Sequence, residues 1–316
     1  MANRTAEEQQ STLTQERVIG KVTGVVDGPI FIFIGGMHGN EPSSIQALKK
    51  VFAELKKMGP LYQGTVLGIA GNLQALEECK RFIDEDLNRI WIPHVIERVR
   101  NEPEELLPTN EQRELKRILE CVDPYLNEAG DKDVYFIDLH SFSAHNGMFA
   151  ITSPAERTKN VAAFLNVPLI YGIEEELEGA AIRYVLDKNA IGLAFEAGQH
   201  IEEKTIHNQE AAIWMLLEAA GLIERSEFKY FDKYETYFIK EAAKLPENVE
   251  LVYRHIIQAD DKFEMKPGYE NFQRIAQGEI LAHDRNGPVK AKCDGYILMP
   301  LYQNQGTDGF FIVQEC

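Results

Sequence analysis

Three mainly apolar runs in this chain each lead into a histidine or a glutamate, and this pattern constrains the fold more than any other feature. The runs cover residues 30–34, 133–139 and 190–195. Apolar runs of this length are typical of strands buried on both faces, as in the sheet of an α/β protein. Ligands and catalytic groups in such sheets gather outside the carboxyl ends of the strands. Because His38, His140 and Glu196 follow the three runs, we predict an α/β domain with a functional site at one sheet edge.

The first run is followed by a glycine turn that contains two kinds of metal ligand. Gly35 and Gly36 allow the chain to turn sharply and to approach a ligand closely. His38 and Glu41 come next, and residues 41–58 then have a helical pattern with a proline in the first turn. Imidazole and carboxylate both suit zinc. The alternative is a glycine turn with a capping asparagine and an incidental histidine, because H-x-x-E is a short and common motif.

His38, Glu41 and His140 together would form a catalytic zinc site, which has three protein ligands and a fourth position open for water. Zinc lowers the pKa of such a water toward neutrality, and a second carboxylate must then accept the proton. Glu196 is the candidate general base because it ends a different strand from either histidine. Asp138 would either orient the imidazole of His140 or simply end its strand. The alternatives are a hydrogen-bonded core histidine at 140 and an exposed strand-end carboxylate at 196.

Residues 81–89 would supply positive charge for the oxyanion that develops during hydrolysis of an amide. Arg81 lies at the start of this segment, and Asn88 and Arg89 lie at its end. Asn88 and Arg89 would bind a substrate carboxylate, since a guanidinium can bind a carboxylate through two parallel hydrogen bonds. Two aspartates within the segment, at 84 and 86, would hold the arginines in place. The alternative is a network of surface ion pairs.

The composition argues against several classes of partner. The formal net charge is −17 over 316 residues, whereas nucleic acids and anionic membranes require a basic surface. Four cysteines without C-x-x-C spacing favour a reducing compartment. Residues 1–16 are polar and lack the apolar centre of a signal peptide, and no run of about 18 apolar residues predicts a membrane span. We therefore expect a cytoplasmic protein that binds neither nucleic acid nor membrane.

The chain is expected to form two domains, a catalytic α/β domain over residues 1–226 and a small β-rich domain over residues 227–316. Residues 228–238 are rich in aromatic side chains and predict β structure, and glycine and asparagine turns interrupt the tail. Residues 93–130 are rich in Glu, Arg and Leu. We predict that this segment is helical, broken by its prolines and mostly outside the sheet, with its charges on a solvated face.

Four segments, in this order, resemble the aspartoacylase/succinylglutamate desuccinylase family. They are Gly35-Gly-Met-His38-Gly-Asn-Glu41, Arg81-Phe-Ile-Asp-Glu-Asp86-Leu-Asn88-Arg89, Asp138-Leu-His140 and Glu196-Ala-Gly198. The resemblance covers about residues 30–200. It implies a zinc-carboxypeptidase-like domain, with helices flanking a mixed sheet, and a smaller C-terminal all-β domain that narrows the site entrance. The roles that it implies are zinc ligands at His38, Glu41 and His140, a general base and acid at Glu196, polarisation of the carbonyl by Arg81, and binding of the substrate carboxylate by Asn88 and Arg89.

The implied activity is zinc-dependent hydrolysis of the amide bond of an N-acyl amino acid or a related small carboxylate. Two other interpretations stay open, a metallocarboxypeptidase that acts on peptide C-termini and a non-catalytic protein that binds small molecules. Residues 93–130 are longer than the family pattern leads us to expect. Family members that recognise acidic substrates use another arginine ahead of the catalytic glutamate, and Arg183 lies in that region. Tyr302 is the candidate contact from the β domain. The acyl group, the amino acid and homo-oligomer formation are left undetermined.

Overall fold

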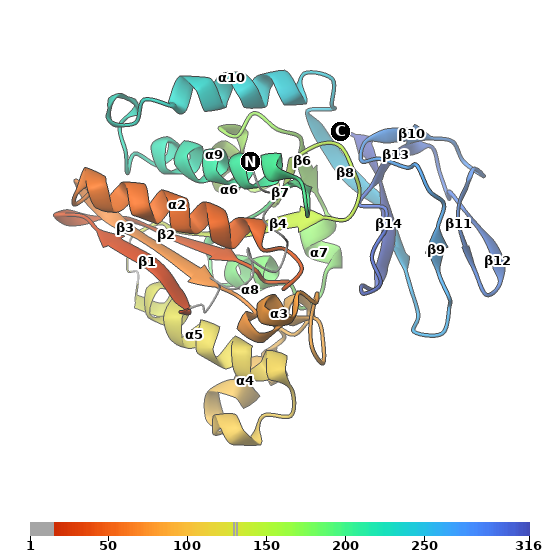
Figure 1. The fold of residues 1–316 in the computed structure, drawn as a ribbon, viewed down its shortest axis with the longest axis horizontal. Helices are drawn as coiled ribbons and strands as arrows, with labels where there is room; N and C mark the ends of the chain where they lie inside the picture. Colours follow the sequence, from red (N-terminus) through yellow and green to blue (C-terminus); the bar gives the residue numbers. More distant parts are fainter. Residues whose placement is uncertain (1–15, 129, 131) are drawn as a thin grey trace, which may run out of the picture.

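The computed structural model describes residues 16–128, 130 and 132–316, which fold around one large sheet (Figure 1). Over these described residues, the sheet has eleven strands in the order β1-β3-β2-β4-β7-β5-β6-β8-β14-β13-β10. The strands in its first part are β1 (Val18–Thr23), β2 (Val26–Gly35), β3 (Gln63–Ala70), β4 (Val134–Phe142), β5 (Phe149–Thr152), β6 (Leu169–Tyr171) and β7 (Ile191–Gln199). The remaining four are β8 (Asn248–Ile256), β10 (Gln273–Ile275), β13 (Gly295–Leu298) and β14 (Asp308–Glu315).

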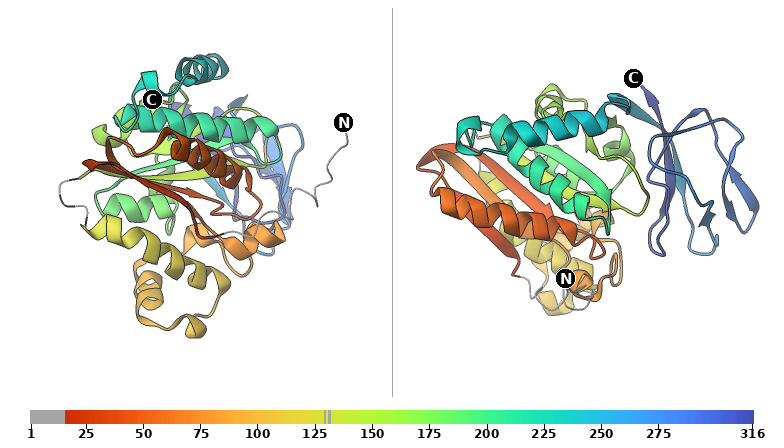
Figure 2. Two further views of the ribbon diagram at one scale, coloured as in Figure 1. Left: turned by 60° about the vertical axis from the view of Figure 1, so that its left-hand side comes forward. Right: turned by 45° about the horizontal axis from the view of Figure 1, so that its top comes forward.

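Helices cover both faces of the parallel centre of this sheet, where β2 pairs with β3 and β4, and β4 pairs with β7. On one face lie α2 (Ser43–Met58) and α9 (Glu203–Ala219), and on the other lie α5 (Asn110–Glu128) and α8 (Ala181–Asp187) (Figures 1 and 2). Burial on both faces explains why the strands are apolar throughout. The α/β fold class predicted from the sequence is confirmed.

The other helical segments are shorter or lie farther from the sheet centre. They are α3 (Leu73–Glu78), α4 (Pro93–Asn101), α6 (Glu156–Ala163), α7 (Ile173–Glu176), α10 (Phe231–Ala242) and the 3₁₀ turns η1 (Leu87–Arg89), η2 (Glu104–Leu106) and η3 (Arg225–Glu227). Within the described part of the chain, no helix combines the length and the apolar character that a membrane crossing requires.

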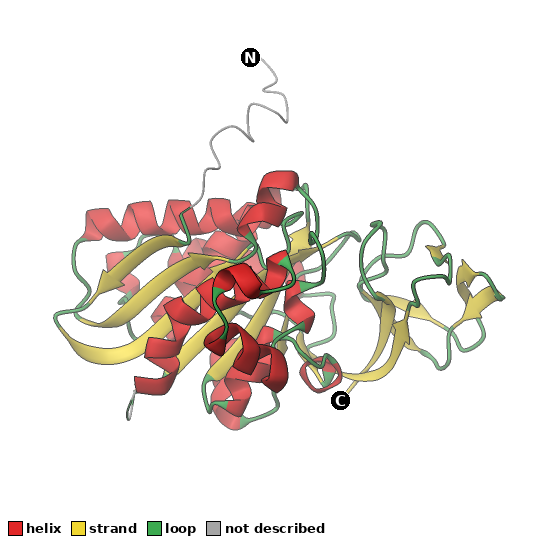
Figure 3. Cartoon of the chain, turned by 90° about the horizontal axis from the view of Figure 1, so that it is seen from below, coloured by secondary structure: helices red, strands yellow, loops and turns green. Residues whose placement is uncertain are grey.

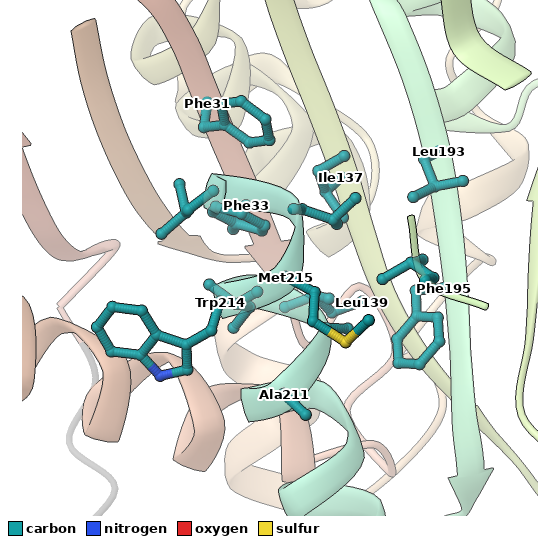
Figure 4. Close-up of a cluster of buried hydrophobic side chains, with 14 of the residues drawn as sticks. Phe31, Phe33, Ile137, Leu139, Leu193, Phe195, Ala211, Trp214 and Met215 are labelled. Carbon is teal, nitrogen blue, oxygen red and sulfur yellow. The ribbon is translucent and has the colours of Figure 1, made fainter. Parts of the chain in front are cut away.

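The alternation of side chains along β4 and β7 decides which residues face the site. Figure 4 shows Leu139 of β4 and Phe195 of β7 packed near Met215 of α9 in the core on one face of the sheet. Successive side chains on a strand point to opposite faces, so the next residues, His140 and Glu196, point to the other face. These two residues are partners in the parallel register of β4 and β7. They therefore lie side by side at the carboxyl ends of adjacent strands.

Most of the segment 228–238 is helical, because α10 begins at Phe231, and the prediction of β structure there is wrong. Phe231, Tyr234 and Phe238 are buried in the core that α2 and α9 share with the sheet. Their i, i+3, i+7 spacing is that of one helix face, and it forms α10, which packs on α9 (Figure 1). A high content of aromatic residues is compatible with either structure, whereas their spacing is typical of a helix.

The described part of the segment 93–130 is helical as predicted and is interrupted near Pro103 and Pro108, but two of the details predicted for it are wrong. Pro124 lies inside α5 and does not break it, because the buried face of this helix packs against the sheet. The charges are not all on a solvated face, since Glu111 and Glu114 are buried. Glu114 forms an ion pair with Arg17 near the amino end of β1.

The C-terminal part is built of strands and loops (Figure 3). Strands β8, β14, β13 and β10 are antiparallel to one another and extend the large sheet, because β8 pairs with β6. A second sheet consists of β9 (Glu264–Met265), β11 (Ile280–Asp284) and β12 (Gly287–Lys290). The segment between β13 and β14 returns toward the carboxyl ends of β2, β4 and β7, where the site lies.

Candidate metal centre and its cavity

Two glycines shape the turn that carries the first site residues. Gly36 has a φ of +67°, which side chains other than glycine rarely tolerate. A Cβ atom on Gly39 would lie 2.0 Å from the carbonyl carbon of Ala75. The chain therefore turns tightly against α3 after β2 and places His38 and Glu41 just beyond the carboxyl end of that strand.

His38, Glu41 and His140 converge in a buried group. One ligand atom from each residue lies within 4.8 Å of the other two. The Glu41 carboxylate lies between the rings, with Oε1 2.8 Å from His38 Nδ1 and Oε2 3.1 Å from His140 Nδ1. Two imidazoles and one carboxylate whose donor atoms converge are a ligand set that suits zinc.

The other nitrogen of each imidazole contacts an aspartate. His38 Nε2 lies 3.1 Å from Asp86 Oδ1, and His140 Nε2 lies 2.8 Å from Asp138 Oδ2. Carboxylates in these positions fix the orientation of a ring and leave its Nδ1 lone pair for a metal. Asp138 thus occupies the orienting position that the sequence suggested. The same role of Asp86 was missed, because 48 residues separate it from His38 and no local pattern links them.

The buried charges of this group are predominantly negative. Burial opposes ionisation of Glu41, but His38 and His140 hold its pKa well below the usual value. Burial likewise disfavours a charged His140, yet Asp138 and Glu41 raise the pKa of that ring well above its usual value. Three carboxylates around two imidazoles create an electrostatic environment that attracts a cation.

Glu196 lies beside this group without being one of its three ligands. Its side chain is almost fully buried, and its Oε2 has no hydrogen-bond partner among the residues that the structure describes. Burial raises the pKa of Glu196 to about 8, with the negative charge of Glu41 contributing and His140 opposing. A carboxyl group that titrates near neutral pH beside a metal centre can both accept and return a proton.

Arg81 is held by an aspartate and also points toward the centre of the group. Its Nε and one terminal nitrogen donate to Asp86 Oδ2 at 3.1 and 2.9 Å. The other terminal nitrogen lies 3.8 Å from Glu41 Oε1. Asp86 therefore positions both Arg81 and His38, and the guanidinium contributes positive charge close to Glu41.

Asn88 and Arg89 line the same cavity, but they differ in whether a hydrogen-bond donor is left without a partner. Asn88 Oδ1 accepts from the backbone N–H of Ala181, and Asn88 Nδ2 lies 3.3 Å from His140 Nε2. Asn88 thus contributes mainly to holding the site together. Arg89 donates to Asp308 at 2.6 Å, and its buried Nε has no hydrogen-bond partner in the described structure. Arg89 thus keeps a donor that no described residue of the chain uses.

Glu111 of α5 positions the loop that carries the arginines. Its carboxylate, which is fully buried, accepts backbone N–H groups from Ile83 at 2.7 Å, Asp84 at 3.0 Å and Glu85 at 3.2 Å. A carboxylate that bonds three consecutive N–H groups fixes the course of the loop from Arg81 onward. Through Glu111, the segment 93–130 contributes to the site. Glu111 contacts residues about 27 positions earlier in the chain, and such a contact leaves no local pattern in the sequence.

Replacement of Glu111 by Gln is expected to lower the free energy of unfolding by about 2–4 kcal/mol, because the amide nitrogen would face backbone donors and leave them unpaired. The displaced arginines should also lower kcat/KM by about tenfold, in line with the cost of small misplacements of catalytic groups. Urea unfolding and steady-state kinetics measure the two effects. Glu120→Gln, an exposed position on the same helix, is the matched control. Equal stability of the two variants would contradict this role.

The segment between β13 and β14 closes one side of the cavity. Gln303 accepts from Asn40 Nδ2 at 2.7 Å, and Gln305 accepts from the backbone N–H of Arg81 at 3.0 Å. The hydroxyl group of Tyr302, the contact suggested by the sequence, instead bonds to the backbone of Tyr269 and Lys266, whereas its backbone N–H donates to Ser143 Oγ at 2.9 Å. Sequence reasoning missed these glutamines because polar residues in a loop carry no pattern.

Arg183 does not line the cavity that contains His38, Glu41 and His140. It is half exposed, its Nε is 3.4 Å from Asp187 Oδ1, and it lines a separate surface depression beside Trp91 and Tyr184. Ile182, its neighbour on α8, lines the cavity instead.

Comparison with known proteins gives a consistent result. The family model described as the succinylglutamate desuccinylase/aspartoacylase catalytic domain matches residues 27–219, which contain every predicted site residue except Tyr302. A probable aspartoacylase from Acaryochloris marina is 30% identical over 120 residues, a match that covers 38% of this chain and 37% of that protein. The succinylglutamate desuccinylase of Pseudomonas paraeruginosa is 23% identical over 290 residues, which cover 83% of this chain and 76% of that protein.

A solved structure extends the likeness to nearly the whole chain. The succinylglutamate desuccinylase/aspartoacylase from Rhodobacter sphaeroides has a TM-score of 0.65 and 16% identity, and the match covers 94% of this chain and 88% of that one. Likeness at this identity shows that the two proteins share a fold that includes the C-terminal part.

Proposed function

Because the chain belongs to the succinylglutamate desuccinylase/aspartoacylase family, whose members are deacylating hydrolases, we propose that it is a zinc-dependent hydrolase of N-acyl amino acids. In this proposal His38, Glu41 and His140 hold one Zn²⁺, and a water molecule cleaves the amide bond. The observation that carries the proposal is the convergence of these three ligands beside Glu196, a buried carboxyl group with an unpartnered oxygen.

The ligand set supports zinc in particular. Catalytic zinc sites hold the metal through three protein side chains and leave a position for water or substrate. Bound there, Zn²⁺ would supply Lewis acidity toward a water molecule and toward the amide carbonyl. Asp86 and Asp138 would keep the two imidazoles oriented through their Nε2 atoms.

The remaining steps fall to side chains of this chain. Glu196 would take a proton from the attacking water as the oxygen bonds to the acyl carbon. The same proton would then pass to the amine nitrogen as the C–N bond breaks, so that a carboxylic acid and a free amino acid leave. Arg81 would stabilise the negative charge on the former carbonyl oxygen. Arg89 would hold the substrate carboxylate through its unpartnered Nε.

The surroundings of the site support a small substrate over a peptide. Gln303 and Gln305 anchor the segment between β13 and β14 to residues on either side of the metal-binding group, which restricts the space for a longer chain. Glu196 also favours catalysis over binding alone, because recognition of a small molecule does not need a proton acceptor.

A test combines metal analysis with a substrate screen. We expect about one zinc ion per chain, in line with a single three-ligand site, and release of free amine from N-acetyl or N-succinyl amino acids by zinc-loaded protein. Activity should fall as the substrate is extended to di- and tripeptides. Activity that rises with peptide length would favour a carboxypeptidase, and zinc-loaded protein without amine release would argue against the proposal.

A further inference from the structure

A second buried carboxyl group, which the proposed reaction does not use, lines the same cavity. Glu174 of α7 is 2% exposed, and neither of its carboxyl oxygens has a hydrogen-bond partner within the described residues. It is nonetheless part of the cavity wall that also includes His38, Arg81 and Glu196. A buried carboxyl group without a partner is costly, so its presence in a cavity wall requires an explanation.

Apolar residues form part of the same cavity wall. They include Ile151, Ile173, Leu177, Ala180, Ile182 and Phe311. Burial raises the pKa of Glu174 to about 7, while the nearby backbone N–H groups of Glu174 and Gly172 oppose the shift and the charge of Glu175 adds to it. Apolar side chains together with the buried carboxyl group of Glu174 suit a flexible aliphatic arm that ends in a positive charge.

The nearby arginines of the chain are already paired with other acids. Arg81 binds Asp86, Arg89 binds Asp308, and Arg183 lies 3.4 Å from Asp187. No side-chain partner for the Glu174 carboxylate is therefore found on the described part of the chain. A cation brought by a ligand would satisfy both oxygens and remove the cost of burial.

We propose that Glu174 is a specificity-determining residue that binds a cationic nitrogen on the side chain of the substrate. This inference rests on the proposed function and narrows it. The preferred substrate is then an N-acylated amino acid with a basic side chain, such as an acylated diamino acid. Glu174 would repel a substrate with an acidic side chain. Arg183, which could attract one, lines a separate depression, and its neighbour Ile182 lines the cavity in its place.

Matched substrates that differ only in the cationic group test this assignment. Nα-acetylornithine and N-acetylnorvaline form one such pair, and N-acetylglutamate supplies the acidic comparison. In the zinc-loaded protein, kcat/KM for Nα-acetylornithine should exceed that for N-acetylnorvaline by about 10- to 100-fold, the discrimination expected of a buried charged contact. In Glu174→Gln this ratio should fall to within about threefold, because the amide keeps the shape and loses the charge. Glu175→Gln, an exposed position on the same helix, is the control that should keep the preference.

Direct binding separates this inference from the proposed function. Calorimetry with Glu196→Gln, in which Glu174 is intact, should give tighter binding of Nα-acetylornithine than of N-acetylnorvaline, whether or not the protein hydrolyses either compound. Equal affinities, or a preference in kcat/KM that survives in Glu174→Gln, would overturn the role of Glu174 while leaving the hydrolase proposal intact. Selective binding that depends on Glu174, without any turnover by wild-type protein, would support Glu174 and count against the hydrolase.

Discussion

Glu196→Gln is expected to lower kcat by about 10³- to 10⁴-fold, the upper range for loss of a general base that also serves as the acid. The amide has nearly the same shape as the carboxyl group but cannot accept a proton from water. Glu196 is not among the three converging ligand residues, so zinc should stay bound at one ion per chain. Steady-state kinetics together with elemental analysis of the same sample measure both quantities.

A matched substitution shows whether the effect is specific to the site. Glu202→Gln changes the same functional group on a residue that follows β7 and pairs with Lys204 outside the cavity, and it should retain near wild-type turnover. Unimpaired turnover by Glu196→Gln would remove this residue from the mechanism. Loss of zinc from that variant would instead indicate a role in holding the metal.

Glu196→Gln should also change how the stability of the metal-free protein depends on pH. Because burial raises the pKa of Glu196 from 4.5 to about 8, the folded state binds more protons than the unfolded state between these two values. Wild-type stability should therefore decrease as pH rises from about 4.5 to 8, whereas Glu196→Gln lacks this contribution. The stability advantage of the variant should grow by up to a few kcal/mol over that range and stay constant above it. Chelator-treated samples unfolded in urea at several pH values measure the difference.

His140→Ala is expected to remove zinc and, with it, detectable turnover. The substitution leaves only two of the three ligands, and catalytic zinc sites depend on three. It also leaves Asp138 and Glu41 without the ring that pairs with both. Elemental analysis after gel filtration should find less than about one tenth of a zinc ion per chain, because a two-ligand site binds zinc far more weakly.

His145→Ala is the matched control for this experiment. His145 lies five residues along the chain, is largely exposed and contacts Glu202 at 3.2 Å, so its loss should leave zinc content and turnover unchanged. Retention of a full zinc ion by His140→Ala would mean that the metal binds elsewhere, and the ligand assignment would then be wrong.

The features that were predictable from the sequence are those determined by local rules. An apolar strand buried on both faces determines where its last residue lies, so His140 and Glu196 could be placed at one sheet edge before their partners were known. Partnerships made only by tertiary packing were not predictable. Arg89 and Asp308 are 219 residues apart, and Glu174 has no local pattern that distinguishes it from the exposed glutamates beside it. The helix at 231–242 was missed for a different reason, because its aromatic content received more weight than its spacing.

The pairing of β6 with β8 has a consequence for how substrates enter and leave. Leu169, Ile170 and Tyr171 pair with Asn248, Val249 and Glu250, so one ladder of backbone hydrogen bonds runs from the helix-covered core into the C-terminal strands. A rigid-body swing of those strands would have to break that ladder, and hinge motions occur at loops rather than across paired strands. Opening of the cavity would therefore have to involve residues 299–307, which hydrogen bonds of Gln303 and Gln305 connect to Asn40 and Arg81. If product release limits turnover, loss of the hydrogen bonds of Gln303 or Gln305 should change kcat more than a substitution where β6 pairs with β8.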